Sequence, residues 1–358
     1  MSEAKRAVIV GVGLIGGSVG LALREQGWEV VGVDRDAESL VRARELGAID
    51  TAATLDEVGP CDLAVVATPV DHVADLVGQL LAAGARVVTD VGSVKGPVAA
   101  AVADHRFVPG HPMAGSEQDG IEGAMASLFS GATWVLCPTD RTDDDAFVVV
   151  RDLVVSLGAN PIAMEPDRHD LLVAVVSHVP HLTAATLMGV AEGRAVEHRA
   201  LLRLAAGGFR DMTRVAAGHP AIWPDICVQN AEAIVDVLDQ LIEQLGQIRT
   251  VVADRDRSAL LERLEAARVA RRNLPTTVPE GGAMSEMRVP IQDQRGELAA
   301  LVSLAAELDV NIYDVEIAHS AEGPRGVVVL VVESAVADRY LGGLMARGYR
   351  PSLQAIGS

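Results

Sequence analysis

The chain has 358 residues and a mass of 37.4 kDa, which is long for one domain and predicts two or three. Hydrophobic residues make up 49% and charged residues 22%, a globular composition that excludes a mostly disordered chain. The formal net charge of −19 argues against binding to nucleic acid or to an anionic membrane surface, because both need a basic face.

Cysteine usage and hydropathy indicate the compartment. The three cysteines lie far apart and none forms a Cys-x-x-Cys pair, so we expect reduced thiols and neither a disulfide framework nor a structural zinc site. The apolar run Ala7–Val10 enters a glycine turn, unlike the cleavage region of a secretory leader. The most apolar stretch, Leu171–Ala191, is interrupted by two histidines and a proline, so we expect no membrane span. We therefore expect a soluble, cytoplasmic protein.

The first 165 residues alternate short apolar runs with amphipathic stretches such as Ser18–Gln26 and Ala37–Leu46. The runs are nearly continuous in apolar residues and bounded by Gly, Asp or Pro, which is typical of strands buried on both faces. This alternation predicts an α/β fold, a Rossmann-type doubly wound parallel sheet over residues 1–165. The expected strands are Ala7–Val10, Val30–Val33, Leu63–Ala67, Arg86–Thr89, Phe107–Pro109, Thr133–Cys137 and Pro161–Met164.

Helical spacing replaces the strand signals over residues 166–272, which predicts an all-helical substrate and dimerisation domain. The longest pattern, Pro224–Thr250, corresponds to a helix of roughly 40 Å at 1.5 Å per residue. A single small core does not need such a helix, so we expect a homodimer. The expected helices are Asp167–Glu192, His198–Leu204, Pro224–Thr250 and Ser258–Arg271.

A linker over residues 273–284 contains two prolines and two adjacent glycines. After it, residues 285–358 follow a βαββαβ pattern, which predicts a small ferredoxin-like domain. Its expected strands are Met287–Ile291, Ile312–His319, Gly326–Glu333 and Pro351–Ala355, and its expected helices are Glu297–Leu308 and Ala335–Arg347.

A glycine-rich motif, GVGLIG, stands between the first predicted strand and the first predicted helix. Gly11 allows a tight turn, Gly13 lets the backbone approach a pyrophosphate, and Gly16 lets helix and strand pack closely. Asp34 is placed to accept the ribose 2′-hydroxyl, which favours NAD over NADP, although the neighbouring Arg35 weakens that preference. The predicted cofactor-binding residues are Gly11, Gly13, Leu14, Ile15, Gly16, Asp34, Arg35, Thr68 and Pro69.

Two polar loops, residues 90–96 and 110–117, follow the fourth and fifth predicted strands and so fall at the carboxyl edge of the sheet. Hydride transfer from an alcohol needs a base for the hydroxyl proton, and a histidine suits that role. His111 is the leading candidate by position. A loop histidine that binds only the backbone is an equal alternative on position alone.

The helical part contains further candidates. His178 and His181 are three residues apart on one helical face, but no carboxylate or cysteine lies at ligand spacing, so we expect no metal site. Arg214 is able to clamp a substrate carboxylate with two parallel hydrogen bonds. A surface arginine is the alternative that sequence statistics favour.

In combination, these motifs resemble the prephenate dehydrogenase family, which also includes arogenate and cyclohexadienyl dehydrogenases. The C-terminal module resembles an ACT domain, a small-ligand regulatory fold that some members carry. The matching stretches run in family order: GVGLIGGS (11–18), DVGSVKG (90–96), HPMAGSE with the following DGIEGA (111–124), LFSGATWVLCP (128–138), HD and SHVPH (169–181), and FRDMTR with HPAIWPDICVQN (209–230).

The resemblance implies NAD-dependent oxidative decarboxylation of prephenate to 4-hydroxyphenylpyruvate in tyrosine biosynthesis, with arogenate as the alternative substrate. By motif, His111 accepts the substrate's hydroxyl proton and Ser93 orients that pair. Arg214 binds a substrate carboxylate, and His181 contacts the side-chain end of the substrate. Glu117 lies at the mouth of the site and gates access. The ACT-like module implies tyrosine as an effector.

Two other interpretations remain open. A different two-domain NAD-dependent dehydrogenase would need another catalytic set, such as a lysine, and no lysine follows Lys95. A non-enzymatic NAD sensor would be expected to have lost His111 or Arg214, and both are present. The roles of Lys95 and His178 also stay open, as does the choice between prephenate and arogenate.

Overall fold

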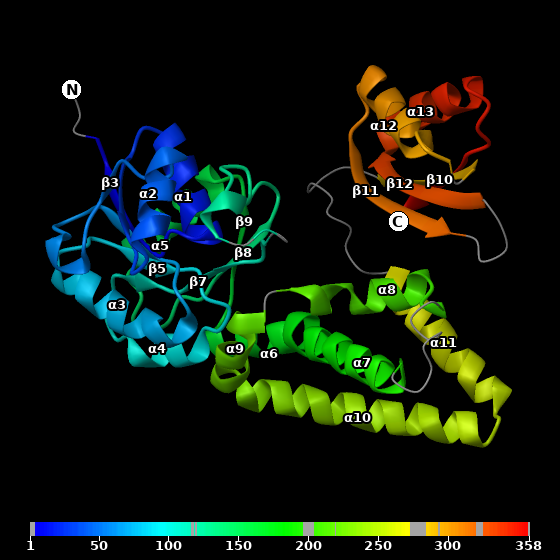
Figure 1. Ribbon diagram of the computed structural model, residues 1–358, viewed down its shortest axis with the longest axis horizontal. Helices are drawn as coiled ribbons and strands as arrows, with labels where there is room; N and C mark the ends of the chain where they lie inside the picture. The colour runs from blue at the N-terminus through cyan, green and yellow to red at the C-terminus, as the bar shows by residue number, and fades with distance from the viewer. Residues whose placement is uncertain are drawn as a thin grey trace. The chain divides into compact units, whose positions relative to one another are not determined.

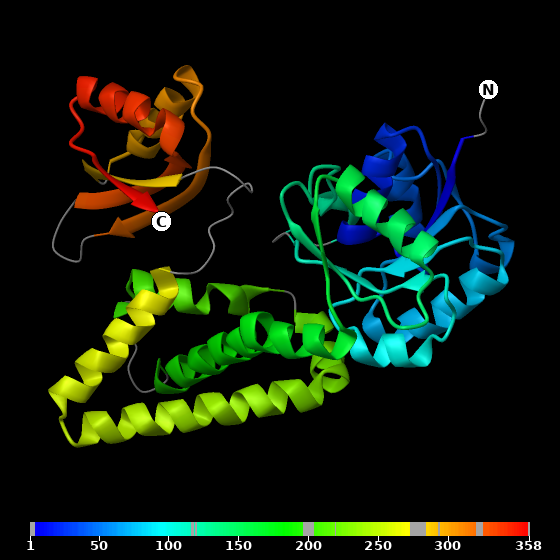
Figure 2. The same ribbon diagram turned by 180° about the vertical axis from the view of Figure 1, so that it is seen from behind.

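The computed structural model describes residues 4–115, 118, 120–195, 204–218, 220–272, 284–292, 294–319 and 325–356. The chain divides into two compact units, residues 1–247 and 248–358. The first unit holds the expected Rossmann residues and most of the expected helical residues. Figure 1 and Figure 2 show the elements from opposite sides. The domain boundaries given above stay predictions.

A parallel sheet forms the centre of the first unit. Its strands are β1 (Arg6–Val10), β2 (Glu29–Val33), β3 (Thr51–Ala52), β4 (Leu63–Val66), β5 (Val88–Asp90) and β6 (Phe107–Val108). Their order, β3-β2-β1-β4-β5-β6, is the Rossmann order, in which the chain reverses direction across the sheet between β1 and β4. Ala7, Val8 and Ile9 of β1 are each 0% exposed, so this strand is buried on both faces as its apolar run predicts.

Helices cover both faces of this sheet. On one face lie α1 (Leu14–Glu25), α2 (Ala37–Glu45) and α5 (Asp144–Ser156), and on the other α3 (Val70–Ala82) and α4 (Gly96–Ala101) (Figure 1). Two clusters of buried side chains correspond to the two faces: Leu23 and Val150 belong to one, Leu80 and Val98 to the other. The doubly wound sheet is therefore confirmed, and its carboxyl edge is where a ligand crevice is expected.

The strands expected around residues 133 and 161 form, but in a second sheet. This sheet contains β7 (Gly110–Pro112), β8 (Thr133–Leu136) and β9 (Asn160–Ala163), with β7 antiparallel and β9 parallel to β8. Pro109 ends β6 because it has no N–H for the ladder. Its carbonyl accepts a hydrogen bond from the N–H of Cys137 at 2.8 Å, which directs the chain into the new sheet.

Helices follow from residue 166. The helix expected over Asp167–Glu192 is three consecutive pieces, because Pro180 has no N–H and a π-helical segment, Ala174–His178, precedes it. The helix expected over His198–Leu204 lies almost entirely outside the described residues. The helical elements are α6 (Pro166–Val173), α7 (Val179–Ala195), α8 (Gly207–Thr213), the 3₁₀ turns Arg214–Ala217 and Pro220–Ile222, α9 (Trp223–Gln229), α10 (Ala231–Ala253) and α11 (Arg257–Arg272).

The long helix expected over Pro224–Thr250 is in fact two helices, α9 and α10, separated at Asn230. The Asn230 amide donates to the carbonyl of Asp170 at 2.9 Å and to Nδ1 of His178 at 3.2 Å. These two bonds tie the buried side chain at this junction to α6 and to the π-helical segment. The partners of Asn230 lie 60 and 52 positions away in the sequence, so helical periodicity does not reveal this junction.

One helical stretch, Pro166–Arg194, is long and apolar enough by composition to cross a membrane, with a mean hydropathy of 1.6. The two histidines and the proline therefore do not take the stretch out of that class by composition. The stretch carries buried His169, Asp170 and His178, and the first two are hydrogen-bonded to residues of the Rossmann part. These contacts fix the beginning of the stretch to the Rossmann part, while 28% of its most apolar window is buried.

The second unit contains a four-stranded antiparallel sheet with the order β11-β12-β10-β13. Its elements follow one another as β10 (Met284–Gln292), α12 (Glu297–Glu307), β11 (Ile312–His319), β12 (Arg325–Glu333), α13 (Ser334–Ala346) and β13 (Ser352–Ile356). Both helices lie on one face of the sheet (Figure 1). Met287, Leu330 and Tyr340 are each 0% exposed between the two layers. The expected linker lies outside the described residues except for its last residue, Met284.

Candidate active site

The turn between β1 and α1 has the geometry that a dinucleotide requires. Gly11 has a φ of +91°, and a Cβ on Gly16 would lie 1.9 Å from the carbonyl oxygen of Gly11, so both positions need glycine. By contrast, no described atom lies within 4 Å of a Cβ placed on Gly13. This open face suits the approach of a pyrophosphate to the amides of Leu14 and Ile15, which begin α1.

Asp34 follows β2 and is fixed beside this turn. Its Oδ2 accepts from the N–H of Val12 and its Oδ1 from the N–H of Asp36, both at 2.9 Å. Each carboxylate oxygen keeps acceptor capacity for a ribose hydroxyl. The residues present therefore fit NAD, which would supply the hydride acceptor at this edge of the sheet.

The remaining predicted cofactor residues surround the same turn. Thr68 and Pro69 follow β4, and the Thr68 methyl group would lie 3.2 Å from a Cβ on Gly11. Arg35 is exposed next to Asp34. The structure therefore brings all nine predicted cofactor residues to one end of the sheet.

A cavity of about 320 Å³ lies where the two polar loops meet the helical part. Ser93, His111 and the loop 112–115 line it from the Rossmann part, and Ser177, His178 and Trp223 line it from the helices. Trp223 also packs against the cluster of buried side chains beneath α3. The volume is in the range of small-molecule sites.

His111, in β7, is bound to a second histidine that was not assigned a role from the sequence. Its Nδ1 lies 2.8 Å from Nε2 of His169, and the two rings meet edge to face at 76°. Burial, together with His169 and Lys95 nearby, holds the pKa of His111 well below its usual value. The ring is therefore neutral at neutral pH, as a general base must be.

Asp170 lies behind His169. Its Oδ1 lies 2.8 Å from Nδ1 of His169 and accepts from the N–H of Lys95 at 2.8 Å, while its Oδ2 accepts from the N–H of Gly96 at 2.7 Å. The carboxylate thus joins α6 to the start of α4. It also orients His169, as a buried carboxylate orients a catalytic histidine in many enzymes.

Lys95 is fully buried, and it is not positioned as a surface cation. Its Nζ pairs with the carboxylate of Asp90 and donates to the carbonyl of Gly110 at 2.9 Å. Asp90 in turn accepts from the N–H of Gly92 at 2.9 Å and of Gly110 at 3.1 Å. These bonds fix both polar loops around His111.

His178 is held by Asn230, whose amide donates to Nδ1. Burial lowers the pKa of His178 to about 4, so the ring is neutral and carries its proton on Nε2. His178 lines the cavity, so it offers a neutral hydrogen-bond donor rather than a charge.

His181 stacks on Trp223, with ring centroids 3.6 Å apart and 13° between the planes. Trp223 also meets His178 edge to face, at 6.2 Å. The spacing of three residues therefore brings both histidines to one tryptophan, as a shared helical face predicts.

The structure does not bring Arg214 or Glu117 into the described lining of the cavity. Arg214 is exposed at the start of the 3₁₀ turn Arg214–Ala217 and is not among the residues that line the cavity. The turn ends near His181, because a Cβ on Gly218 would lie 3.9 Å from Cε1 of that ring. Glu117 lies outside the described residues. Ser93 lines the cavity, but the partner of His111 Nδ1 is His169.

Known proteins resemble this chain over most of its length. A family model described as the nucleotide-binding domain of prephenate dehydrogenase matches residues 19–163, and one described as its dimerization domain matches residues 165–266. A prephenate dehydrogenase of Bacillus subtilis is 32% identical over 350 residues, which are 93% of this chain and 94% of that protein. A cyclohexadienyl dehydrogenase of Zymomonas mobilis is 34% identical over 77% of this chain and 98% of its own length.

Solved structures agree with these matches. Prephenate dehydrogenase from Aquifex aeolicus, in complex with hydroxyphenyl propionate and NAD⁺, has a TM-score of 0.72 at 30% identity and covers 76% of this chain and 99% of its own. An arogenate dehydrogenase from Synechocystis has a TM-score of 0.65 at 29% identity, over 74% of this chain and 98% of its own. The chain therefore belongs to the prephenate dehydrogenase family and is an NAD-dependent oxidoreductase.

Proposed function

We propose that the chain catalyses oxidative decarboxylation of prephenate to 4-hydroxyphenylpyruvate with NAD⁺. The observation that carries this proposal is the neutral, partly buried His111 in a cavity at the carboxyl edge of the sheet. His111 accepts the proton of the ring hydroxyl while the hydride on the same carbon passes to the nicotinamide. Loss of CO₂ then makes the ring aromatic, so the protein's contribution is to position the substrate and to hold charge.

The lining of the cavity supports prephenate over arogenate. Arogenate carries an ammonium group where prephenate has a keto group, and a buried ammonium needs an anionic partner. Among the described residues that line the cavity, none is Asp or Glu, and the histidine beside Asn230 is neutral. Glu117, outside the described residues, is the side chain whose placement bears on this preference.

The test is initial NADH formation by the purified protein with NAD⁺, with prephenate and arogenate assayed side by side. We expect activity with prephenate and a larger kcat/KM for it than for arogenate. A larger kcat/KM for arogenate would overturn the substrate choice. Activity with neither, in a folded protein that binds NAD⁺, would overturn the reaction.

The other side chains predicted by motif are assigned separate roles in binding and orienting the substrate. Ser93, which lines the cavity together with His111, is assigned to orienting His111 and the substrate hydroxyl. His181, held against Trp223, is assigned to the side-chain end of the substrate, and Arg214 to a carboxylate. Glu117 is assigned to the mouth of the site.

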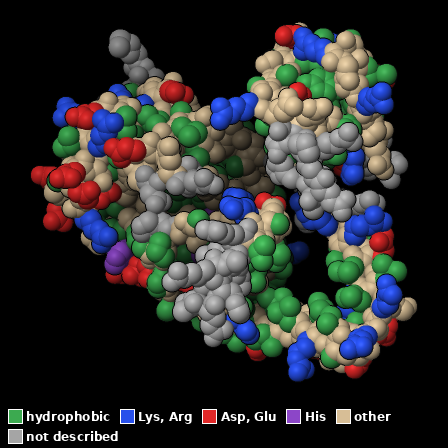
Figure 3. All heavy atoms as spheres, turned by 45° about the vertical axis from the view of Figure 1, so that its right-hand side comes forward, with side chains coloured by type: hydrophobic (Ala, Val, Ile, Leu, Met, Phe, Trp, Pro, Cys, Tyr) green, Lys and Arg blue, Asp and Glu red, His purple; other side chains and the backbone are tan. Residues whose placement is uncertain are grey.

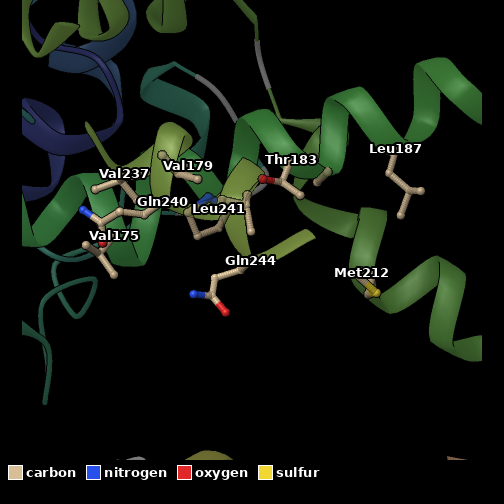
Figure 4. Close-up of a pocket in the computed structure, with 11 residues that line it drawn as sticks. Val175, Val179, Thr183, Leu187, Met212, Val237, Gln240, Leu241 and Gln244 are labelled. Atoms are coloured by element: carbon tan, nitrogen blue, oxygen red, sulfur yellow. The ribbon is translucent and has the colours of Figure 1, made fainter. Parts of the chain in front are cut away.

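We further propose that the protein is a homodimer formed through the helical part. An apolar groove of about 460 Å³ lies between α7 and α10, with Val179, Leu187, Met212 and Leu241 among its lining (Figure 4). Ile242 of α10 is 64% exposed. Figure 3 shows hydrophobic side chains at the surface of this helical part. A large exposed apolar surface is typical of an interface between subunits.

We propose that a second copy of the chain covers this groove. The matching family model is described as a dimerization domain, which supports this choice. Light scattering is expected to give twice the chain mass at micromolar concentration. An Ile242→Glu variant places a charge on that surface and is expected to shift the protein towards the monomer. A monomeric wild-type protein would contradict the proposal.

We also propose that residues 285–358 form an ACT-like regulatory module that binds tyrosine. The βαββαβ order and the sheet order β11-β12-β10-β13 support this assignment. Relatives that match over 98% or 99% of their own length leave about a quarter of this chain unmatched. Tyrosine inhibition that survives deletion of residues 284–358 would contradict the proposal, because the tyrosine would then act outside this module.

A further inference from the structure

A row of three side chains begins at the proposed base, which is partly buried, and leads away from the cavity through two buried residues. His111 is bound to His169, and His169 is bound to Asp170, with 2.8 Å between the bonded atoms at each step. His169 is 1% and Asp170 is 6% exposed, so neither side chain exchanges protons directly with bulk water. Only His111 of the three lines the cavity.

The order of donors in this row follows from its last member. Asp170 accepts hydrogen bonds from two backbone N–H groups, so its carboxylate acts as an acceptor towards His169 as well. His169 therefore carries its proton on Nδ1 and accepts on Nε2. His111 then donates from Nδ1, which leaves Nε2 as its basic atom. The row thus assigns the tautomer in which His111 accepts a substrate proton.

The charges around the row differ at its two ends. Lys95, bound to the carbonyl of Gly110, faces His111 from the Rossmann part, and neutral His178 faces it from the helical part. Asp170 faces His169 directly. Lys95 therefore opposes a positive charge on His111, while Asp170 favours one on His169. Asp90, paired with Lys95, offsets part of the first effect.

We propose that His169 relays the substrate's proton, so that the positive charge formed in the oxidation resides on His169 beside Asp170 and not on His111. The substrate O–H bond breaks as a bond forms to His111 Nε2, and the proton on His111 Nδ1 moves to His169 Nε2. The C–H electron pair leaves with the hydride to NAD⁺, so protons and electrons balance. After the product leaves, the proton returns through His111 to solvent.

This inference rests on the proposed function, since it needs an alcohol oxidised at His111. A simpler alternative is that His169 only fixes the tautomer of His111. Glutamine at position 169 distinguishes a relay from orientation alone. Its amide oxygen accepts the hydrogen bond from His111 Nδ1 but cannot be protonated at neutral pH. His169→Gln therefore preserves orientation and removes the relay, whereas His169→Leu removes both.

The experiment follows single-turnover NADH formation with prephenate in mixtures of H₂O and D₂O. A plot of the wild-type rate against the deuterium fraction of the solvent is expected to be curved, because two protons move in the same step. His169→Gln is expected to be slower by about 10²-fold, the lower end of a general base contribution, with KM and NAD⁺ affinity kept and a linear dependence. His105→Gln, at an exposed histidine, is the matched control and is expected to behave as the wild type.

Two outcomes would overturn the relay. One is a His169→Gln variant as fast as the wild type while His169→Leu is slow, because the role is then orientation alone. The other is a linear dependence in the wild type, a result that does not depend on whether any variant folds. Failure of the wild type to form NADH with either substrate is a failure of the proposed function and is visible before any variant is made.

Discussion

Lys95 forms an ion pair with Asp90 in which neither side chain is exposed to solvent. The same two side chains bind both backbone groups of Gly110, the N–H through Asp90 and the carbonyl through Lys95. Gly110 directly precedes His111. The buried pair therefore sets the position of the proposed base relative to the loop after β5.

A Lys95→Met variant is expected to leave Asp90 buried without its cation. Removing one partner of a buried ion pair costs about 3–5 kcal/mol, so the free energy of unfolding should fall by about that much. Turnover should fall as well, because the Gly110 carbonyl loses its donor. Urea denaturation followed by circular dichroism measures the first effect, and NADH formation the second.

The control for this variant is Arg86→Met, which removes the exposed partner of Asp62. An exposed pair contributes little, so no measurable loss of stability is expected. Equal free energies of unfolding for the two variants would mean that the buried Asp90–Lys95 pair stabilises the fold no more than the exposed pair does.

Gly13 and Gly16 provide a matched pair for the cofactor turn. Gly13→Ala meets no described atom within 4 Å, so the variant should fold normally and lose NAD⁺ affinity. Gly16→Ala meets the Gly11 carbonyl at 1.9 Å and should be destabilised. Thermal melting and NAD⁺ titration by fluorescence separate the two effects. Normal NAD⁺ affinity in Gly13→Ala would argue against the pyrophosphate at this turn.

His111→Asn removes the proposed base while keeping a polar side chain of similar reach. Turnover is expected to fall by about 10²–10⁴-fold, the usual contribution of a general base. NAD⁺ affinity should be kept, because the glycine turn is separate from β7. Near-normal turnover would show that another group accepts the proton.

Local patterns predicted the Rossmann part well, because its signals are contained in short stretches. Continuous apolar runs correspond to β1, β2 and β4 within one residue at either end. The glycine motif is equally local, since Gly11 and Gly16 are required by contacts within the turn itself. The sequence was therefore sufficient for the central strands of the parallel sheet, but not for its edge strand β3 or for the second sheet that contains β8 and β9.

The interior of the site was not predictable in the same way. His169 and Asp170 were recognised only as part of a family motif, since their partners lie 58 and 75 positions away in the sequence. The side chain of Asn230, at the junction of α9 and α10, likewise bonds to His178, which is 52 positions away. Hydrogen bonds between distant segments produce no periodic pattern in the sequence. The sequence alone therefore does not show which polar residues are buried and bonded in the site.

Arg214→Ala tests the carboxylate clamp. Loss of a bidentate ion pair with the substrate should raise KM for prephenate and leave NAD⁺ affinity unchanged. Arg210→Ala, at an exposed arginine one turn earlier in α8, is the control. An unchanged Michaelis constant in Arg214→Ala would refute the clamp role.

His178 should make the protein lose stability in acid. Its pKa is about 4 in the folded chain against 6.5 when unfolded, because burial disfavours the charged ring. Above pH 6.5 neither state binds the proton, so the residue contributes no pH dependence there. As the pH falls from 6.5 towards 4, the unfolded chain binds a proton that the folded chain does not, which costs about 3 kcal/mol in full.

Urea denaturation at pH 7 and at pH 4.5 measures this cost as the difference between wild type and His178→Gln. The variant should lose about 2–3 kcal/mol less on acidification, because glutamine does not titrate, while the carboxylates contribute alike in both proteins. His105→Gln, at an exposed ring, should lose as much as the wild type. An equal acid loss in His178→Gln and the wild type would mean that the His178 ring is not held neutral, and its assignment as a neutral donor in the cavity would fail with it.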